Sequence, residues 1–269
     1  DLSDGFWRMV VQGGDEPNFL YVLPARPDTP QVHAVMPGAL QMGWTNSPPY
    51  FCQVTTIICR LIERIMAVTM ATGGVQTPHP LERFARPPDS GPLAAGPLAH
   101  DFTFVLKVFV DDFMTGVAVP PHVSPSPYIQ WVARACLHGT HAVFPPPSVS
   151  GHTNGRDSIS ITKMDKGDGV FQPHKALVGF MFCGSPGNLR TVGLERSKWQ
   201  RYRDELDHAL AQKRHCIPWK SFESLYGKLQ HVATCLPLMR AYMTALNTVF
   251  RHKSQTVGLG KRSILRFTL

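Results

Sequence analysis

Residues 102–112 read FTFVLKVFVDD, an apolar run that ends in two aspartates. The run is rich in β-branched and aromatic side chains, which predicts a buried strand over Phe102–Val110 followed by a turn. Neighbouring side chains of a strand point to opposite faces, so Asp111 and Asp112 should leave the turn in different directions. Taken alone, an acidic pair at a strand end is more often a solvated turn than a metal site.

Acidic residues near the start of the chain offer partners for this pair. Two magnesium ions about 3.5–4 Å apart can activate a primer hydroxyl and stabilise the leaving oxygens in nucleotidyl transfer. Magnesium takes oxygen ligands, so carboxylates must converge from separate segments. Acids stand at Asp1 and Asp4 as well as at Asp111 and Asp112. We expect Asp1 and Asp111 to face one cleft, with Asp112 ligating from the side.

The segment before this strand predicts a small hairpin and a long helix. Phe19–Leu23 and His33–Leu40 are expected as paired strands. Apolar residues recur at helical spacing over Pro48–Met70, which predicts an amphipathic helix. Asn46 or Ser47 can cap this helix, and Pro48 suits its first turn.

The segment after the strand predicts both helix and strand, and its last part predicts helices. We expect a helix over Tyr128–Leu137 and a strand over Lys175–Cys183, with a Pro/Gly-rich surface loop over 76–100 and a second polar insertion over 145–169. Strands first and helices last predict an α+β fold. Three helices are expected near the end: Arg196–Lys213, Trp219–Cys235 and Leu238–His252.

Composition indicates a folded protein with a polyanionic partner. Hydrophobic residues make up 43% of the 269 residues, and 27 Lys and Arg against 19 Asp and Glu give a net charge of +8. No apolar run is long enough to span a bilayer, so nucleic acid is favoured over a membrane surface. The scattered cysteines predict reduced thiols in an intracellular protein, cytoplasmic or nuclear. Cys136, His138, His141 and His152 match no usual zinc spacing.

Five short stretches resemble, in the same order, motifs of the reverse transcriptases. The first resembles their first metal-binding motif, the second their template- and nucleotide-contacting turn and helix, and the third their aromatic-x-Asp-Asp signature. The fourth resembles their primer-grip hairpin, and the fifth the thumb of LTR and tyrosine-recombinase retroelements. The stretches are DLSDGFW (1–7), LQMGWTNSPPYF (40–51), FVDD (109–112), LVGF (177–180) and SLYGKL (224–229).

The resemblance implies a polymerase palm, an antiparallel sheet flanked by helices, followed by an α-helical thumb, with the fingers largely missing. The palm is expected over 1–186, with a remnant of fingers at 12–40 and the insertions at 76–100 and 145–169. The helical thumb and connection are expected over 187–269. The implied activity is RNA-directed DNA synthesis with two Mg²⁺ or Mn²⁺ ions, an RNA template, a DNA primer and deoxynucleoside triphosphates.

The same resemblance assigns site residues. Asp1 and Asp111 match the two principal metal ligands, and Asp112 matches the third carboxylate. Phe6 matches the aromatic steric gate that excludes a ribose 2′-hydroxyl, and Met42 and Gly43 belong to the nucleotide-contacting turn. Template- and primer-binding residues are implied at Trp44, Asn46, Ser47, Pro48, Gly179, Phe180, Lys220 and Lys228. Lys198, Arg201, Arg203 and Arg240 are further cations that can track a duplex backbone.

Two features depart from the family pattern. Met42 stands where the family usually has glutamine, with Gln41 one residue earlier. The chain also begins at the first catalytic aspartate, so we expect a piece of a polyprotein, weakly active or inactive alone, whose parent carries an RNase H domain after residue 269. A lysine that protonates the leaving pyrophosphate is sought among Lys163, Lys166 and Lys175. The alternative function is an inactive or domesticated remnant that binds RNA or RNA–DNA hybrid.

Overall fold

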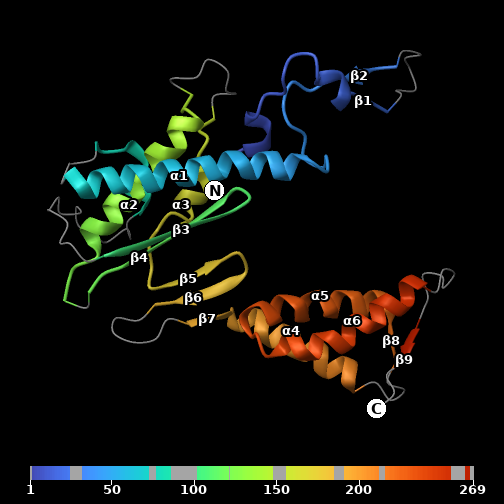
Figure 1. Ribbon diagram of the computed structural model, residues 1–269. Helices are drawn as coiled ribbons and strands as arrows, with labels where there is room; N and C mark the ends of the chain where they lie inside the picture. Colours follow the sequence, from blue (N-terminus) through green and yellow to red (C-terminus); the bar gives the residue numbers. More distant parts are fainter. Residues whose placement is uncertain are drawn as a thin grey trace. The chain divides into compact units, whose positions relative to one another are not determined.

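The protein forms a mixed α+β structure with small antiparallel sheets, seen in a computed structural model (Figure 1). The structure describes residues 2–24, 32–72, 77–85, 102–120, 122–147, 156–184, 191–211, 216–255 and 264–266. The chain divides into two compact units, Asp1–Gln172 and Pro173–Leu269. None of the described helices combines the length and the apolar character that crossing a bilayer requires.

Unit 1, Asp1–Gln172, is built around two helices and a hairpin. Helix α1 (Ser47–Thr72) packs against helix α2 (Ser126–Val143), and both contact the antiparallel pair β3 (Thr103–Phe109) and β4 (Asp112–Ala118). Their shared core is apolar and contains, among others, Phe51, Ile58, Ile62, Leu106 and Val132. The long helix and the strand that ends in a turn are therefore confirmed, and the turn contains Asp111.

Shorter elements surround this core. Strands β1 (Tyr21–Val22) and β2 (Ala34–Val35) pair as expected, although each is only two residues long. The described part of the unit also contains the 3-10 helices η1 (Gly5–Arg8), η2 (Glu16–Phe19) and η3 (Pro80–Ala85) and helix α3 (Ile161–Asp165).

Two predictions for this unit are wrong. Strand β3 is not buried on both faces, because Val105 and Phe109 are 52% and 57% exposed. The described part of the first insertion, residues 77–85, is not a surface loop: it folds into η3 and buries Leu81.

Unit 2, Pro173–Leu269, combines a three-stranded sheet with three helices. The sheet order is β5 (His174–Leu177), β6 (Phe180–Cys183) and β7 (Thr191–Leu194), all antiparallel. The helices are α4 (Arg196–Leu210), α5 (Trp219–Cys235) and α6 (Met239–Gln255), close to their predicted ranges. A further pair joins β8 (Cys216–Pro218) and β9 (Ile264–Arg266).

The predicted single strand over Lys175–Cys183 is wrong, because the chain reverses at Val178–Gly179 and forms a hairpin. This hairpin packs on the helices that follow: the ring of Phe180 stacks on His231 of α5, with centroids 4.2 Å apart. The compact units therefore divide before β5, whereas the predicted palm and thumb divide after residue 186.

Candidate active site

The acidic pair lies at the two-residue turn between β3 and β4. Phe109 pairs with Asp112 across the hairpin, which leaves Val110 and Asp111 as the turn. Val110 has a φ of 58°. A β-branched side chain in this left-handed region is strained, and such strain gathers at functional sites. The turn that contains Asp111 and leads into Asp112 is therefore strained at Val110.

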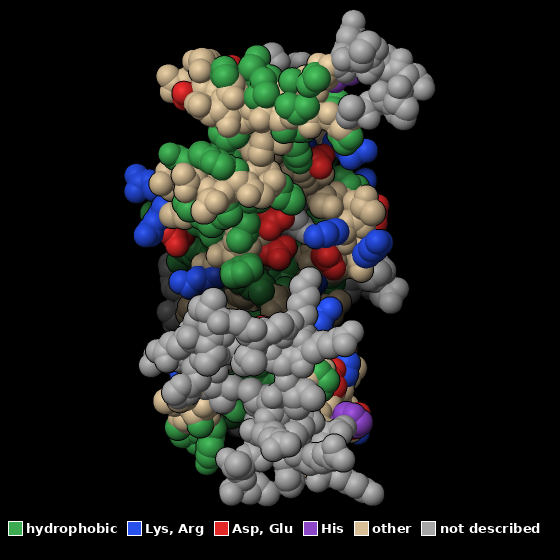
Figure 2. Space-filling view, turned by 90° about the vertical axis from the view of Figure 1, so that its right-hand side faces the viewer, with side chains coloured by type: hydrophobic (Ala, Val, Ile, Leu, Met, Phe, Trp, Pro, Cys, Tyr) green, Lys and Arg blue, Asp and Glu red, His purple; other side chains and the backbone are tan. Residues whose placement is uncertain are grey.

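A third carboxylate, that of Asp168, acts electrostatically on Asp112. Burial raises the pKa of Asp112, and the neighbouring carboxylates of Asp111 and Asp168 raise it further. Such mutual repulsion is relieved by a bound cation, and carboxylate oxygens are the ligands that Mg²⁺ prefers. Sequence reasoning missed Asp168, whose only local signal is the Gly-Asp-Gly turn at 167–169. Figure 2 shows acidic side chains exposed on unit 1 near Lys or Arg side chains.

Asp1, the predicted first ligand, lies outside the described residues. The residue after it is described: Leu2 pairs with Ile159 in an isolated β-bridge and lies in the core. Leu2 and Phe113, the residue after Asp112, line one cavity of about 140 Å³ together with Lys163 and Asp168. Within the described segments, no three His, Cys, Asp or Glu side chains form a group that could hold a metal ion.

Phe6, the predicted steric gate, is fixed on the long helix. Its ring stacks on Phe51 of α1, with centroids 4.4 Å apart and planes 22° apart. Gly5 permits this approach, because a Cβ at that position would lie 2.6 Å from the Phe51 ring. The first motif is therefore packed directly against the start of α1.

The predicted nucleotide- and template-contacting turn leads into α1 and is largely exposed. Met42 is 70% exposed and Gly43 forms the turn beside it. Trp44, 37% exposed, stacks parallel to Tyr50 at 5.9 Å and meets the ring of Phe19 edge-on.

The residues that open α1 have two different environments. Asn46 and Pro48 are exposed. Ser47 is fully buried, and its hydroxyl donates to the carbonyl of Gln41 at 2.5 Å. Ser47 therefore shapes the turn, whereas Asn46 and Pro48 remain accessible to a template.

The predicted primer-grip hairpin lies in unit 2. Val178 and Gly179 form its turn with φ values of 49° and 83°. A Cβ on Gly179 would lie 3.0 Å from His231 Nε2 and 3.2 Å from Lys198 Nζ. Both this close approach and the positive φ favour glycine at the position. Gly179 and Phe180 are thus held on the helices of their own unit.

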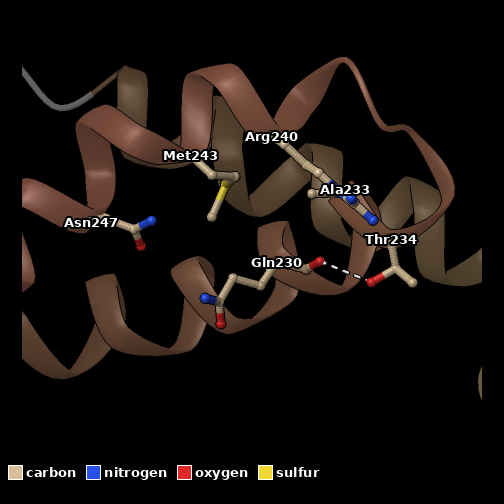
Figure 3. A pocket seen from close by; sticks show the side chains of 6 residues that line it. All are labelled: Gln230, Ala233, Thr234, Arg240, Met243 and Asn247. Carbon is tan, nitrogen blue, oxygen red and sulfur yellow. Dashed lines mark hydrogen bonds between the residues drawn. The ribbon is translucent and has the colours of Figure 1, made fainter.

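The basic residues of unit 2 differ in how strongly they are engaged. Lys228 is paired with Glu205, and Arg203 lies 3.6 Å from Asp207. Lys220 is exposed, and within the described segments Lys220 and Arg240 have no ion pair. Arg240 of α6 lines a cavity of about 270 Å³ with Gln230 and Thr234 of α5 among others (Figure 3).

Charge is divided unequally between the two units. Pro173–Leu269 contains 16 Lys and Arg against 5 Asp and Glu, a net charge of +11. Asp1–Gln172 contains 11 against 14, a net charge of −3. The surplus that favours a polyanion therefore belongs to unit 2, and the candidate metal ligands belong to unit 1.

The described side chains do not favour zinc at Cys136, His138 and His141. Burial raises the pKa of the Cys136 thiol to about 12, which opposes the thiolate that zinc needs. Both ring nitrogens of His141 already have protein partners, His79 and Asp157. His152 lies outside the described residues.

Comparison with protein-family models, with curated proteins and with solved structures finds no match to this chain. What the site does is therefore inferred from its own residues and from their resemblance to reverse-transcriptase motifs.

Proposed function

We propose that this chain is the palm and thumb of a reverse transcriptase, an RNA-directed DNA polymerase of an LTR- or tyrosine-recombinase-type retrotransposon. The observation that carries the proposal is the strained turn between β3 and β4 at Asp111 and Asp112, where the carboxylate of Asp168 helps to raise the pKa of Asp112. The separate basic unit supports it, because copying requires a grip on a polyanionic duplex.

In this proposal Asp1, Asp111 and Asp112 hold two divalent cations, Mg²⁺ or Mn²⁺. Bound there, the cations would supply activation of the primer hydroxyl and stabilisation of the leaving oxygens. Phe6, fixed against Phe51, excludes a ribose 2′-hydroxyl, and the exposed turn at Met42–Trp44 meets the nucleotide and the template. Gly179 and Phe180 steady the primer end, and Lys220 with its neighbours binds the duplex backbone.

The test is incorporation of a deoxynucleotide onto a DNA primer annealed to an RNA template, with and without magnesium. Asp111→Asn should reduce magnesium-dependent incorporation by more than ~100-fold. Substituting a residue that only hydrogen-bonds to a metal ligand already lowers metal affinity or activity roughly 10–100-fold, and Asp111 is proposed as a ligand itself. Asp204→Asn is the matched control, because Asp204 is an exposed acid of α4 that accepts a bond from Gln200. Incorporation that survives Asp111→Asn would reject the assignment.

The second candidate is a binding protein for RNA or RNA–DNA hybrid without catalysis. Two observations favour it: the net charge of +11 on unit 2, and a described acidic group that is not by itself a complete metal site. Tight hybrid binding by a chain that incorporates no nucleotide, with no effect of Asp111→Asn on binding, would select this candidate.

A further inference from the structure

A chain of buried hydrogen bonds links three ionisable residues of unit 1. The amide of Leu81 donates to His79 Nδ1 at 3.1 Å, so the proton of that ring lies on Nε2. His79 Nε2 lies 3.0 Å from His141 Nδ1, which must accept. His141 Nε2 then donates to Asp157 Oδ1 at 2.9 Å. The amide at one end and the carboxylate at the other fix both tautomers.

The surroundings keep the His79 ring neutral. His79 is 7% exposed, and its pKa is lowered to about 4, chiefly by burial and also by His141 and His138, while Asp157 and Glu82 oppose the shift. The other charges nearby are paired, since Glu82 binds Arg134 at 2.5 Å. The His79 ring therefore keeps one donor and one acceptor nitrogen around neutral pH.

The carboxylate end of this chain organises residues 157–159. Asp157 Oδ1 also accepts the amide of Ile159 at 2.8 Å. The hydroxyl of Ser158, fully buried, donates to the carbonyl of Phe144 at the end of α2. These contacts fix a short segment on the core, although most of the insertion that contains it is polar.

Residues 157–159 bind residues near the start of the protein. The amide of Ser3 donates to the carbonyl of Ser158 at 2.7 Å, and Leu2 pairs with Ile159. The guanidinium of Arg8 donates to the carbonyls of Ser3 and Asp157, each at 2.8 Å. Residues 2 and 3 are therefore held by the same segment that the histidines hold.

We propose that His79, His141 and Asp157 are positioning residues: through 157–159 they hold Leu2 and Ser3, and so the start of the first metal-binding motif, beside the β3–β4 hairpin. Leu2 and Phe113 line the same cavity, which ties this segment to the strand that carries Asp112. This inference rests on the proposed polymerase function for its consequence, but its structural part concerns residues 2–3 alone.

Hydrogen exchange of the Ser3 amide in the full chain tests the structural part. His141→Phe removes the middle of the hydrogen-bond chain and should speed Ser3 exchange by roughly 10-fold, the effect of losing a bond to a charged group. If that variant does not fold, Asp157→Ala carries the same expectation, because it removes the acceptor. Asp157→Asn keeps the acceptor oxygen and should restore most of the protection.

His138→Phe is the matched control, since His138 lies on the same helix and packs edge-on against His79 without joining the chain. It should leave Ser3 exchange within about twofold of the original. Ser3 protection that is unchanged in His141→Phe and in Asp157→Ala, or lost equally in the control, would overturn the inference.

A second readout separates this inference from the proposed function. In primer extension, His141→Phe or Asp157→Ala should raise the magnesium concentration for half-maximal rate several-fold, while the KM for the nucleotide changes little. If the original chain shows no incorporation, as expected of a piece that is inactive alone, Ser3 exchange by itself decides the positioning role. Faster Ser3 exchange with an unchanged magnesium requirement would reject the catalytic consequence.

Discussion

Each of the two units contains a hairpin with a similar turn, but the side chains at the turn and the net charge of the unit differ. In unit 1 the turn Val110–Asp111 leads into Asp112, and in unit 2 the turn Val178–Gly179 leads into Phe180. Both begin with a valine at positive φ. The first turn carries carboxylates in a unit of net charge −3, and the second carries glycine and an aromatic ring in a unit of +11. We propose that the same type of turn serves metal binding in one unit and a grip on nucleic acid in the other.

The largest expected difference between the units is their response to salt. If unit 2 contacts about six phosphates, raising salt from 50 to 200 mM should weaken binding of an RNA–DNA hybrid by roughly 10³-fold. Lys220→Gln should lower the slope of log affinity against log salt by about 0.9. Arg60→Gln is the control, because Arg60 belongs to unit 1 and pairs with Glu63. Binding is measured by fluorescence anisotropy. If both substitutions lower the salt slope equally, hybrid binding cannot be assigned to unit 2.

The second expected difference is stability in acid. The pKa of His79 falls from 6.5 to about 4 on folding, so the unfolded chain binds more protons between these values. The contribution of neutral His79 to the stability of unit 1 is fully present above pH 6.5 and is lost as the pH falls to 4. This loss lowers the free energy of unfolding by on the order of 3 kcal/mol. The pKa of Glu82, lowered to about 2 chiefly by its bond to Arg134, extends the loss from pH 4.5 downward.

Urea denaturation at pH 7, 5.5 and 4 measures this difference. Trp131 reports unit 1 and Trp219 reports unit 2, since both indoles are buried. The midpoint for Trp131 should fall more than that for Trp219. In the His79→Gln variant, the decrease of the Trp131 urea midpoint between pH 6.5 and 4 should be smaller. Equal decreases of the Trp131 and Trp219 midpoints in the original protein would contradict the assignment of the acid sensitivity to unit 1.

The smallest expected difference concerns the two valines. Val178 is 37% exposed, so Val178→Gly relieves backbone strain at little packing cost and should stabilise unit 2 by roughly 0.5–1 kcal/mol. Val110 packs against the core of unit 1, so Val110→Gly should give no net gain. Chemical denaturation of both variants compares the two turns, and a similar gain in both would show that Val110 packing is unimportant.

Local sequence patterns were sufficient for the elements that depend on local physics. The apolar spacing over Pro48–Met70 predicted α1, whose buried face includes Phe51, Ile58 and Ile62. Trp219–Cys235 was predicted with the bounds that the structure has, because Pro218 precedes it and apolar residues recur along it. The turn before Asp111 was also visible, as a change from apolar residues to acids.

Features that depend on distant partners could not be predicted. His79 and His141 are 62 positions apart, and no local signal marks them as hydrogen-bonded neighbours. Asp168 approaches Asp112 only after the second insertion folds onto the core. Over Lys175–Cys183 the apolar pattern wrongly predicted one strand. The resemblance of residues 177–180 to a primer-grip hairpin did indicate the turn, which has positive φ values at Val178 and Gly179.

The central claim is that the start of the chain and the β3–β4 turn share bound divalent cations. Mn²⁺ can replace Mg²⁺ at oxygen ligands, and its unpaired electrons broaden nearby NMR signals. In a Mn²⁺ titration the amides of Leu2 and Phe113 should broaden together at one metal concentration, and Asp111→Asn combined with Asp112→Asn should abolish both effects. Broadening at only one of the two amides, or broadening that persists in the double variant, would contradict a shared metal site.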